Sequence, residues 1–235
     1  MNVLITGTSS GLGDGLAKHY LNAGWQVYGI SRKGNPELEA HPQFHFLAHD
    51  LSKLEETPDR LAGFIELIDT FDLVILNAGI LNEIKDLHNT RLDEIKHVMD
   101  VNVWANKVLI DVLADQVAEV RQVVAISSGA SVSGARGWNA YSLSKATLNM
   151  LISLYSKEFP DTHFCALAPG LIDTGMQDYI YNLPDEEAFP VVKRLKKAKG
   201  TDQMPDGKKA AQKIADAIEK IRKMESGSFQ DVRTI

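Results

Sequence analysis

Two side chains four residues apart have the chemistry to exchange a proton with a ligand. Tyr141 and Lys145 lie in a stretch with helical spacing, so both project from one face of a helix, about 5–6 Å apart. A phenol with an ordinary pKa of about 10 is a poor acid or base at neutral pH. A cation one turn away favours the phenolate and lowers that pKa. The pair therefore predicts a general acid/base centre at the tyrosine.

The spacing of this pair alone is not specific. Among six tyrosines, chance would place a lysine at the fourth following position roughly 0.4 times. A nearby hydroxyl adds weight, because Ser128 follows the predicted strand Gln122–Ser127, at the carboxyl edge where open α/β sheets bind ligands. A carbonyl oxygen held between Ser128 and Tyr141 would be stabilised as negative charge develops on it.

A glycine-rich turn at the start of the chain has the pattern of a phosphate-binding site. Gly7, Gly11 and Gly13 stand between the apolar run Val3–Thr6 and a stretch with helical periodicity. Glycine permits the dihedral angles of such a turn and the close approach of a pyrophosphate, which the N-terminus of the following helix attracts. This position favours dinucleotide binding over a merely structural turn. The turn also contains Ser9, Ser10 and Leu12.

The end of the second predicted strand indicates which dinucleotide is bound. Ser31, Arg32 and Lys33 stand where an acidic residue would bind the ribose hydroxyls of NAD. A hydroxyl and two cations suit the 2′-phosphate of NADP instead, and Arg32 can hold it through two parallel hydrogen bonds. The sequence therefore predicts NADP(H) in preference to NAD(H). The alternative is that both cations are ordinary loop charges.

These residues must be positioned by alternating strands and helices, which is the pattern of a parallel sheet covered on both faces. The predicted strands are Val3–Thr6, Gln26–Ser31, Phe44–Ala48, Leu73–Leu76, Gln122–Ser127, His163–Ala168 and Ser228–Val232. The predicted helices span about 12–23, 52–69, 91–117, 139–158 and 206–224, and in the fourth the expected buried face is Leu148, Leu151, Leu154 and Tyr155. The predicted fold is α/β, a Rossmann-type doubly wound parallel sheet in one domain over residues 1–235.

The long connection Gly170–Pro205 lacks strong periodicity and predicts a substrate lid over about 170–205. Its basic run, residues 193–199, is interpreted as a solvated helical face in preference to an anion contact. Apolar and aromatic side chains of the lid region favour a hydrophobic ketone, aldehyde or quinone as substrate. This set is Trp138, Leu171, Ile172, Met176, Tyr179, Ile180, Tyr181 and Phe189.

Taken together and in order, these motifs resemble the short-chain dehydrogenase/reductase family, in its compact single-domain branch, over residues 2–232. The matching residues are Thr6-Gly7, Gly11-Leu12-Gly13, Asp50-Leu51, Asn77-Ala78-Gly79, Asn102, Ser128, Tyr141 with Lys145, and Pro169-Gly170 with Thr174. The resemblance implies an oxidoreductase that uses NAD(P)(H) on a carbonyl or secondary alcohol. Ser10 stands where some NADP-preferring members carry a basic residue, so the preference depends mainly on Arg32.

The resemblance also implies individual roles. The three turn glycines would hold the diphosphate, Asp50 and Leu51 would contact the adenine, and Asn77, Ala78 and Gly79 would lie under the adenosine ribose. Tyr141 would be the acid/base, Lys145 would hold the nicotinamide ribose and lower the tyrosine pKa, and Ser128 would orient the carbonyl. Asn102 would anchor a water that links Lys145 to solvent. The carboxamide would be held by the segment Pro169, Gly170, Ile172 and Thr174.

Composition excludes several other classes of protein. A net charge of −6 and a pI near 5.6 disfavour nucleic-acid binding, and no apolar run approaches the roughly 20 residues that span a bilayer. A single cysteine, Cys165, favours a cytoplasmic location and is expected to pack as a small hydrophobe. No metal is expected, because His41, His45 and His49 recur across a predicted strand, where such spacing separates side chains by about 13 Å. Trp104 is expected to pack in the core or a helix interface.

Two interpretations stay open beside the enzyme. A nucleotide-binding signalling or sensor protein could retain the fold, although it would not need Asn102, Ser128, Tyr141 and Lys145 together. A sugar-nucleotide epimerase of the extended branch fits poorly, since such chains carry an added C-terminal domain. The resemblance further implies a homodimer, paired through the helices at 91–117 and 139–158.

Overall fold

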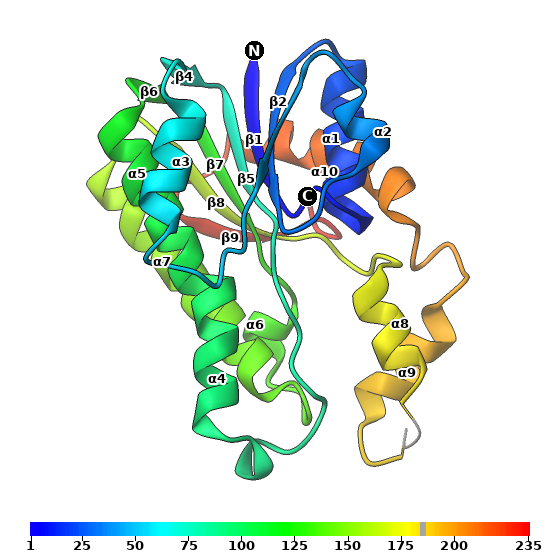
Figure 1. Cartoon of the computed structure of the whole chain (residues 1–235). Coiled ribbons are helices and arrows are strands. Elements are labelled where there is room, and N and C mark those ends of the chain that lie inside the picture. Colours follow the sequence, from blue (N-terminus) through cyan, green and yellow to red (C-terminus); the bar gives the residue numbers. More distant parts are fainter. Residues whose placement is uncertain (184–186) are drawn as a thin grey trace.

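The centre of the molecule, described by a computed structural model for residues 1–183 and 187–235, is a parallel sheet (Figure 1). Its seven strands have the order β3-β2-β1-β5-β7-β8-β9. They are β1 Asn2–Thr6, β2 Gln26–Ser31, β3 Phe44–Ala48, β5 Leu73–Leu76, β7 Gln122–Ile126, β8 His163–Ala168 and β9 Ser228–Asp231. All seven correspond to predicted strands, and the Rossmann-type fold class is confirmed.

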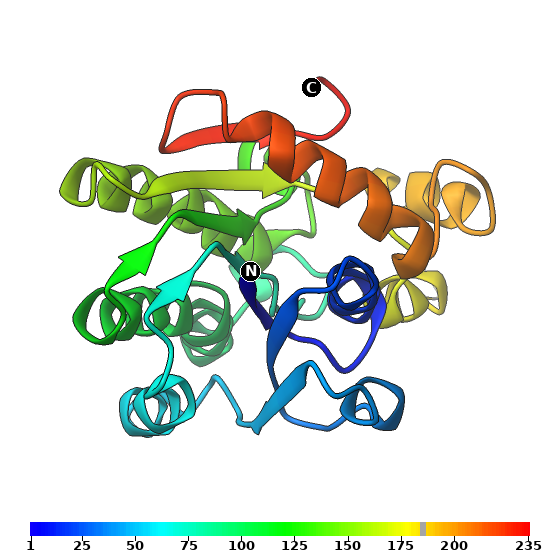
Figure 2. The same cartoon turned by 90° about the horizontal axis from the view of Figure 1, so that it is seen from above.

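Helices cover both faces of this sheet (Figure 2). Successive strand side chains point to opposite faces, so Ile5 and Ile75 pack with α1 (Gly11–Asn22) and α10 (Gly207–Ile221). Leu4 and Val74 pack on the other face with α3 (Thr57–Ile65), α5 (Ala105–Gln116) and α7 (Asn139–Glu158). Nearly continuous apolar strands are therefore buried on both sides.

Cys165 lies in β8 between two neighbouring strands and is fully buried, as the apolar run around it predicted. Burial raises the pKa of its thiol to about 12 because the charged form is disfavoured away from water. The described part of the chain contains no helix with the length and apolar character needed to cross a bilayer.

The predicted helix 91–117 is interrupted. Helix α4 (Leu92–Met99) continues through a π-helical turn at Asp100–Trp104 before α5 begins. A π turn inserts an extra residue and rotates the side chains that follow. Trp104 is 39% exposed, so of the two places predicted for it, the core or a helix interface, the core is wrong, and Leu154 of α7 is 55% exposed although its spacing predicted burial.

Several short elements fall outside the predicted pattern. A separate two-stranded parallel sheet joins β4 (Thr70–Phe71) to β6 (Glu119–Val120), at the amino ends of the central strands. Helices α2 (Pro36–Glu39) and α6 (Ala130–Ser133) and a 3₁₀ turn at Leu87–Asn89 are each one turn long. Segments this short give too few residues for a periodic signal.

The predicted irregular connection over 170–205 contains two helices, α8 (Gly175–Tyr181) and α9 (Pro190–Ala198). Residues 184–186 of this connection lie outside the described residues. Both helices lie at the carboxyl end of the sheet, across from α4 and α6 (Figure 1). Ile180, Val192 and Leu195 form an apolar cluster with Trp138 and Met204. The segment is held by its own small core.

The turn between β1 and α1 depends on close backbone approach. Gly7 has a φ of +79°, in the region that favours glycine, and a Cβ on Gly13 would lie 2.1 Å from the Gly7 carbonyl oxygen. The Thr6 hydroxyl oxygen accepts the backbone N–H groups of Asn77 and Ala78, each at 2.9 Å. The Asn77 amide donates back to the Thr6 carbonyl at 2.9 Å. These bonds fasten the ends of β1 and β5 together.

Candidate active site

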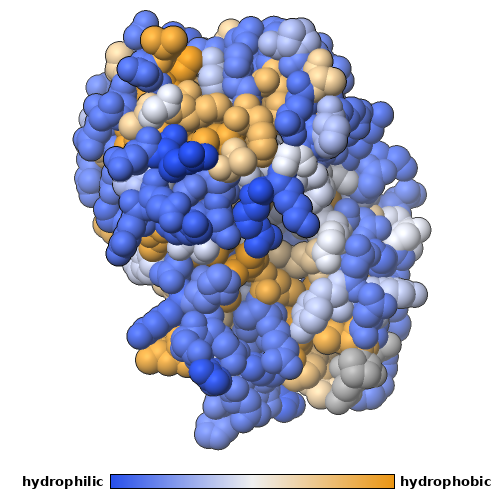
Figure 3. All heavy atoms as spheres, in the orientation of Figure 1, coloured by the Kyte–Doolittle hydropathy of each residue, from blue (hydrophilic) through white to orange (hydrophobic). Residues whose placement is uncertain are grey.

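A cavity of about 760 Å³ opens at the carboxyl edge of the sheet. Figure 3 shows a hollow on this face, with apolar side chains beside it. Most of the predicted site residues line this cavity: Gly7, Ser9, Ser10, Gly11, Leu12, Ser31, Arg32, Asp50, Leu51, Asn77, Ala78, Gly79, Ser128, Tyr141, Lys145, Pro169, Gly170, Ile172 and Thr174. Residues separated by more than 160 positions therefore meet at one edge of the sheet.

Three predicted residues are not part of the cavity wall. Gly13 lies directly behind Gly7, where only a hydrogen fits. Lys33 is exposed outside the cavity, and its backbone carbonyl accepts the Ser31 hydroxyl at 2.8 Å. Asn102 is fully buried behind the wall. Gly13 and Asn102 therefore support the wall from behind, whereas the structure does not bring Lys33 to the cavity.

The end of the cavity near β2 and β3 is rich in cations. Arg32 lines it and also a second hollow of about 380 Å³, whose other basic lining residues include Lys53 and Arg60. Arg60 donates to the Ala48 carbonyl at 3.0 Å, and Ala48 is the sheet partner of Ser31. A second guanidinium therefore lies beside the end of β2. The sequence gave no sign of Arg60, because it comes from α3 and only the sheet register brings it here.

Asp50 lies at the same end of the cavity and stays ionised. Its carboxylate accepts the backbone N–H of Ser52 at 3.0 Å, and this bond, with the nearby charge of Arg32, holds its pKa below the usual range. A charged acceptor in this position suits an amino group of a bound base. The predicted contact of Asp50 with adenine is sterically compatible with its place on the wall.

The residues of the turn fit a pyrophosphate. Ser10 precedes α1 but its side chain caps none of the helix N–H groups, so the first turn keeps donors for an anion. Any side chain at Gly13 would collide with Gly7, and a Cβ at Gly11 would meet Thr174 at 3.1 Å. A nicotinamide dinucleotide, with its diphosphate at this turn, therefore fits the residues present.

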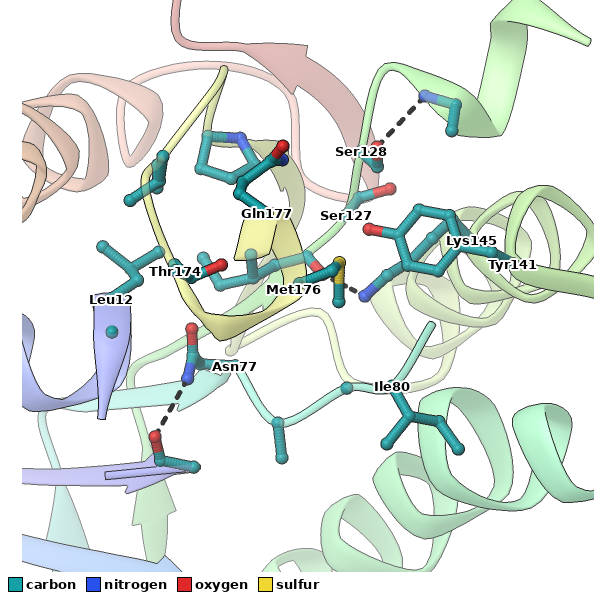
Figure 4. A pocket seen from close by; sticks show the side chains of 18 of the residues that line it. Leu12, Asn77, Ile80, Ser127, Ser128, Tyr141, Lys145, Thr174, Met176 and Gln177 are labelled. Carbon is teal, nitrogen blue, oxygen red and sulfur yellow. Dashed lines mark hydrogen bonds between the residues drawn. The ribbon is translucent and has the colours of Figure 1, made fainter. Parts of the chain in front are cut away.

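Tyr141, Lys145 and Ser128 meet in the middle of the cavity (Figure 4). The Tyr141 hydroxyl points toward the Ser127–Ser128 turn, and its hydrogen bond with Ser128 favours the phenolate. The Lys145 ammonium is buried, lies 5.8 Å from the centre of the tyrosine ring and donates to the Ile126 carbonyl at 2.7 Å. The predicted geometry of the pair, on one face of a helix, is present.

The electrostatics of this pair differ from the prediction. Burial raises the pKa of the Tyr141 phenol above its ordinary value, and this effect exceeds the opposing hydrogen bond from Ser128. Burial also lowers the pKa of the Lys145 ammonium to about 8. Because both groups lose hydration, the ammonium does not bring the phenol pKa down, and the tyrosine keeps its proton at neutral pH. The protonated phenol is the form that can donate to a carbonyl.

Asn102 supports the wall from behind. Its side-chain oxygen accepts the Ile80 N–H at 2.8 Å, and its amide donates to the Ile80 carbonyl and to the Ser144 hydroxyl, each at 3.0 Å. Ser144 belongs to α7. A Cβ on Gly79 would lie 3.3 Å from the Asn102 oxygen and 3.5 Å from the Lys145 nitrogen. The π-helical turn thus places Asn102 beside Lys145 and ties α7 to the segment after β5.

A second network fixes the start of α7. The Asn82 side-chain oxygen accepts the backbone N–H of Tyr141 at 3.2 Å, and the Asn82 amide donates to the side-chain oxygen of Asn139. Asn139 in turn donates to the Lys85 carbonyl and to the Thr90 hydroxyl, at 2.9 and 2.8 Å. The bond to Asn82 satisfies the backbone N–H of Tyr141 in the first turn of α7, a helix that its N-cap residue, Trp138, does not cap. The sequence analysis did not identify either asparagine.

Three charged residues of the wall were also missed as site residues. Arg194 reaches the cavity from α9, and Asp231 and Arg233 reach it from the end of β9. Asp231 and Arg233 pair with one another through two hydrogen bonds. Arg194 belongs to the basic run that was interpreted as a solvated face. Of the predicted apolar set, Trp138, Leu171, Ile172, Met176 and Ile180 line the cavity, whereas Tyr179, Tyr181 and Phe189 are not part of its wall.

The arrangement combines a buried phenol, a hydroxyl and an ammonium beside a long cavity whose glycine turn fits a diphosphate. This arrangement can hold a small carbonyl compound next to a dinucleotide, donate a proton to its oxygen and keep the reacting atoms away from bulk water.

Comparison with known proteins gives the same family in three ways. The family model for short chain dehydrogenases matches residues 1–183. A benzil reductase ((S)-benzoin forming) of Bacillus subtilis is 28% identical, over 98% of this chain and 97% of its own, and an uncharacterized oxidoreductase of Schizosaccharomyces pombe is 32% identical over 80% and 77%. A crystal structure of a short chain dehydrogenase/reductase from Saccharomyces cerevisiae has a TM-score of 0.86 at 22% identity, covering 98% of this chain and 95% of that one.

The lowered pKa of Lys145 predicts a pH dependence of stability. Between about pH 8 and the ordinary value of 10.5, the folded protein binds fewer protons than the unfolded chain, so the free energy of unfolding rises with pH in this window. Below it, both states hold the proton and the cost of the buried charge is fully present. Relative to Lys145→Met, which lacks the charge, the native chain should gain about 3 kcal/mol across this window in urea unfolding. A constant difference would contradict the burial of a charged ammonium.

Proposed function

The chain belongs to the short-chain dehydrogenase/reductase family of oxidoreductases, and we propose that it is an NADP(H)-dependent enzyme that reduces a carbonyl group, or oxidises a secondary alcohol. The observation that carries this proposal is the meeting of Tyr141, Lys145 and Ser128 in one cavity with the glycine turn. Asn102 stands directly behind them. A nucleotide sensor would need the turn but would have no use for these four side chains together.

In reduction, Tyr141 acts as the general acid. Burial keeps its phenol protonated at neutral pH, so the proton is present when negative charge develops on the carbonyl oxygen. Ser128 orients that oxygen through its hydroxyl. The ammonium of Lys145 lies close enough to the ring to stabilise the phenolate that remains. When bound, the dihydronicotinamide supplies the hydride; Gly7, Gly11 and the first turn of α1 would hold its diphosphate.

The preference for NADP(H) is supported by the cations around the end of β2. Arg32 lines both hollows there, and Arg60 adds a second guanidinium in the smaller one. Among the described residues, Asp50 is the only carboxylate that lines both hollows. A guanidinium fork binds phosphate oxygens through paired, charge-assisted hydrogen bonds. The family resemblance alone leaves NAD(H) and NADP(H) both open.

The substrate we propose is a hydrophobic ketone, aldehyde or quinone, and residues 170–205 act as its lid. Trp138, Leu171, Met176 and Ile180 give the catalytic end of the cavity an apolar wall. The benzil reductase similarity makes aromatic diketones a suitable first probe. The proposal includes a cytoplasmic location, supported by the single buried thiol of Cys165, which has no partner for an internal disulfide.

The direct test of the reaction is turnover of carbonyl compounds with NADPH. Benzil, aliphatic ketones, aldehydes and quinones should include substrates for the native chain, and Tyr141→Phe should lower kcat by about 100-fold or more, since general acid catalysis contributes 10²–10⁴. Cofactor binding by the variant should be unchanged, which separates loss of the proton from loss of the site. Retention of activity by Tyr141→Phe would remove the tyrosine from this role.

Cofactor preference can be tested with paired substitutions. Arg32→Gln should lower kcat/KM for NADPH by about 10- to 100-fold, the worth of a charge-assisted hydrogen bond, and should leave the value for NADH nearly unchanged. Lys33→Gln is the matched control, because Lys33 lies outside the cavity and should change neither value appreciably. A native chain that prefers NADH would overturn the proposal.

We also propose that the chain forms a homodimer through α5 and α7. Leu143, Met150 and Leu154 are 45%, 60% and 55% exposed, and their spacing places them on one face of α7. Trp104, 39% exposed, extends the apolar character toward the start of α5. An apolar stripe of this kind is typical of an interface rather than of a solvated helix face.

The dimer predicts a change in mass when the stripe is made polar. Met150→Glu with Leu154→Glu should convert the dimer to a monomer in sedimentation velocity, because two carboxylates would have to be buried without partners. Leu67→Glu is the control, since Leu67 is 91% exposed and follows α3 rather than belonging to α5 or α7. A native chain that sediments as a monomer would contradict the proposal.

A further inference from the structure

The inner face of α9 carries one cation into the substrate end of the cavity. Val191, Arg194 and Leu195 line the cavity, and their spacing of three and four residues places them on one side of the helix. Leu195 and Val191 pack in the cluster that includes Trp138 and Tyr141. Arg194 is itself exposed, at the rim of the cavity, and the two residues that flank it pack on the side of the catalytic tyrosine.

The neighbouring cations of the same basic run are engaged elsewhere. Lys193 pairs with Glu187 at 2.8 Å, and Lys199 pairs with Asp173 and Asp178 at 2.5 and 2.8 Å. Lys197 is exposed and is not part of the cavity wall. Arg194 and Lys197 are both exposed, as the interpretation of a solvated helical face expected, but only Arg194 also lines the cavity.

The other cations of the cavity wall already have partners or a proposed use. Lys145 donates to the Ile126 carbonyl, and Arg233 is neutralised by two hydrogen bonds to Asp231. Arg32 lies at the adenosine end, where its charge acts on Asp50. In the part of the chain that the structure describes, no carboxylate or carbonyl binds the guanidinium of Arg194. It is a cation of the substrate end without a role in the proposed reaction.

An unpaired guanidinium beside apolar side chains favours a particular ligand. Arg194 is exposed, so its guanidinium can meet an anion that enters the cavity without first breaking an ion pair with a described residue. Its planar fork matches the two oxygens of a carboxylate. The apolar residues around it would accept the hydrocarbon part of the same molecule. The carbonyl to be reduced would then lie at Tyr141 and the carboxylate at the lid.

We propose that Arg194 binds a carboxylate of the substrate, so that the preferred substrates are apolar oxo acids rather than neutral ketones. This inference rests on the proposed carbonyl reductase activity and names the substrate class of that same site. It also separates this chain from an enzyme that acts only on neutral diketones, because such a substrate leaves Arg194 without a partner.

The test compares aryl ketones with and without the charge. Benzoylformate, benzoylpropionate and benzoylbutyrate place a carboxylate at increasing distance from the carbonyl, and their methyl esters are neutral counterparts of similar shape. With NADPH, the native chain should have a lower KM for at least one acid than for its ester. Arg194→Gln should raise that KM by about 10- to 100-fold, as expected for a charge-assisted hydrogen bond, with the KM for the ester and for NADPH nearly unchanged.

Lys197→Gln is the matched control, because it removes the same charge from the same helix outside the cavity wall. It should leave the KM for the acid unchanged. Equal effects of Arg194→Gln on acid and ester, equal KM values for both in the native chain, or a rise confined to the KM for NADPH would overturn the inference; the last would assign Arg194 to the cofactor phosphates.

Equilibrium binding distinguishes this inference from the proposed function itself. Calorimetric titration of the acids and esters, with and without NADPH, should show tighter binding of an acid to the native chain and loss of that difference in Arg194→Gln. If benzil and the esters are reduced but the acids have no advantage in binding, only the role of Arg194 fails. If no carbonyl is reduced with NADPH or NADH, the proposed activity fails, and acid binding still decides the role of Arg194.

Discussion

The parallel pairing of β1 with β5 is the constraint on which the site depends. The strand order changes direction here, because β1 has β2 on one side and β5 on the other, and ligands of open α/β sheets bind at such a point. Three hydrogen bonds hold the two strand ends together, since Thr6 accepts two from Asn77 and one from the backbone N–H of Ala78. Since Gly7 follows one strand and Gly79 the other, the same bonds set the position of the diphosphate turn relative to the wall beside Lys145.

Burial governs the chemistry of the catalytic pair. Removed from water, Tyr141 holds its proton more firmly and Lys145 holds its proton less firmly, so the pKa of the phenol lies above that of the ammonium, the reverse of their usual order. The cost of burying the ammonium is offset by the Ile126 carbonyl. Asn102 and Asn82 keep α7 in place from opposite sides. The side chains that exchange the proton are thus held in place by hydrogen bonds from neighbouring segments.

The sequence predicted the elements that have a local pattern, and it missed the elements and residues whose position depends on tertiary packing. All seven strands were predicted, several of them from nearly continuous apolar runs such as Leu73–Leu76, and the glycine spacing predicted the phosphate turn. The helices of the 170–205 segment were missed because their apolar residues are few and bury against Trp138, far away in sequence. Leu154 looked buried because periodicity gives the face of a helix but not what covers it. Arg194 reaches the cavity, and Arg60 reaches the second hollow beside it, only through tertiary contacts.

The lone cysteine has a consequence for how opening of the molecule could be followed. Its sulfur lies in β8, with β7 and β9 hydrogen-bonded on either side and helices above and below. Because β9 is an edge strand of the sheet, an alkylating reagent can reach this atom when β9 or the covering helices separate from β8, whereas fraying at the opposite edge strand, β3, leaves it shielded. Its rate of modification would therefore report opening of the β9 side of the molecule, without an introduced label.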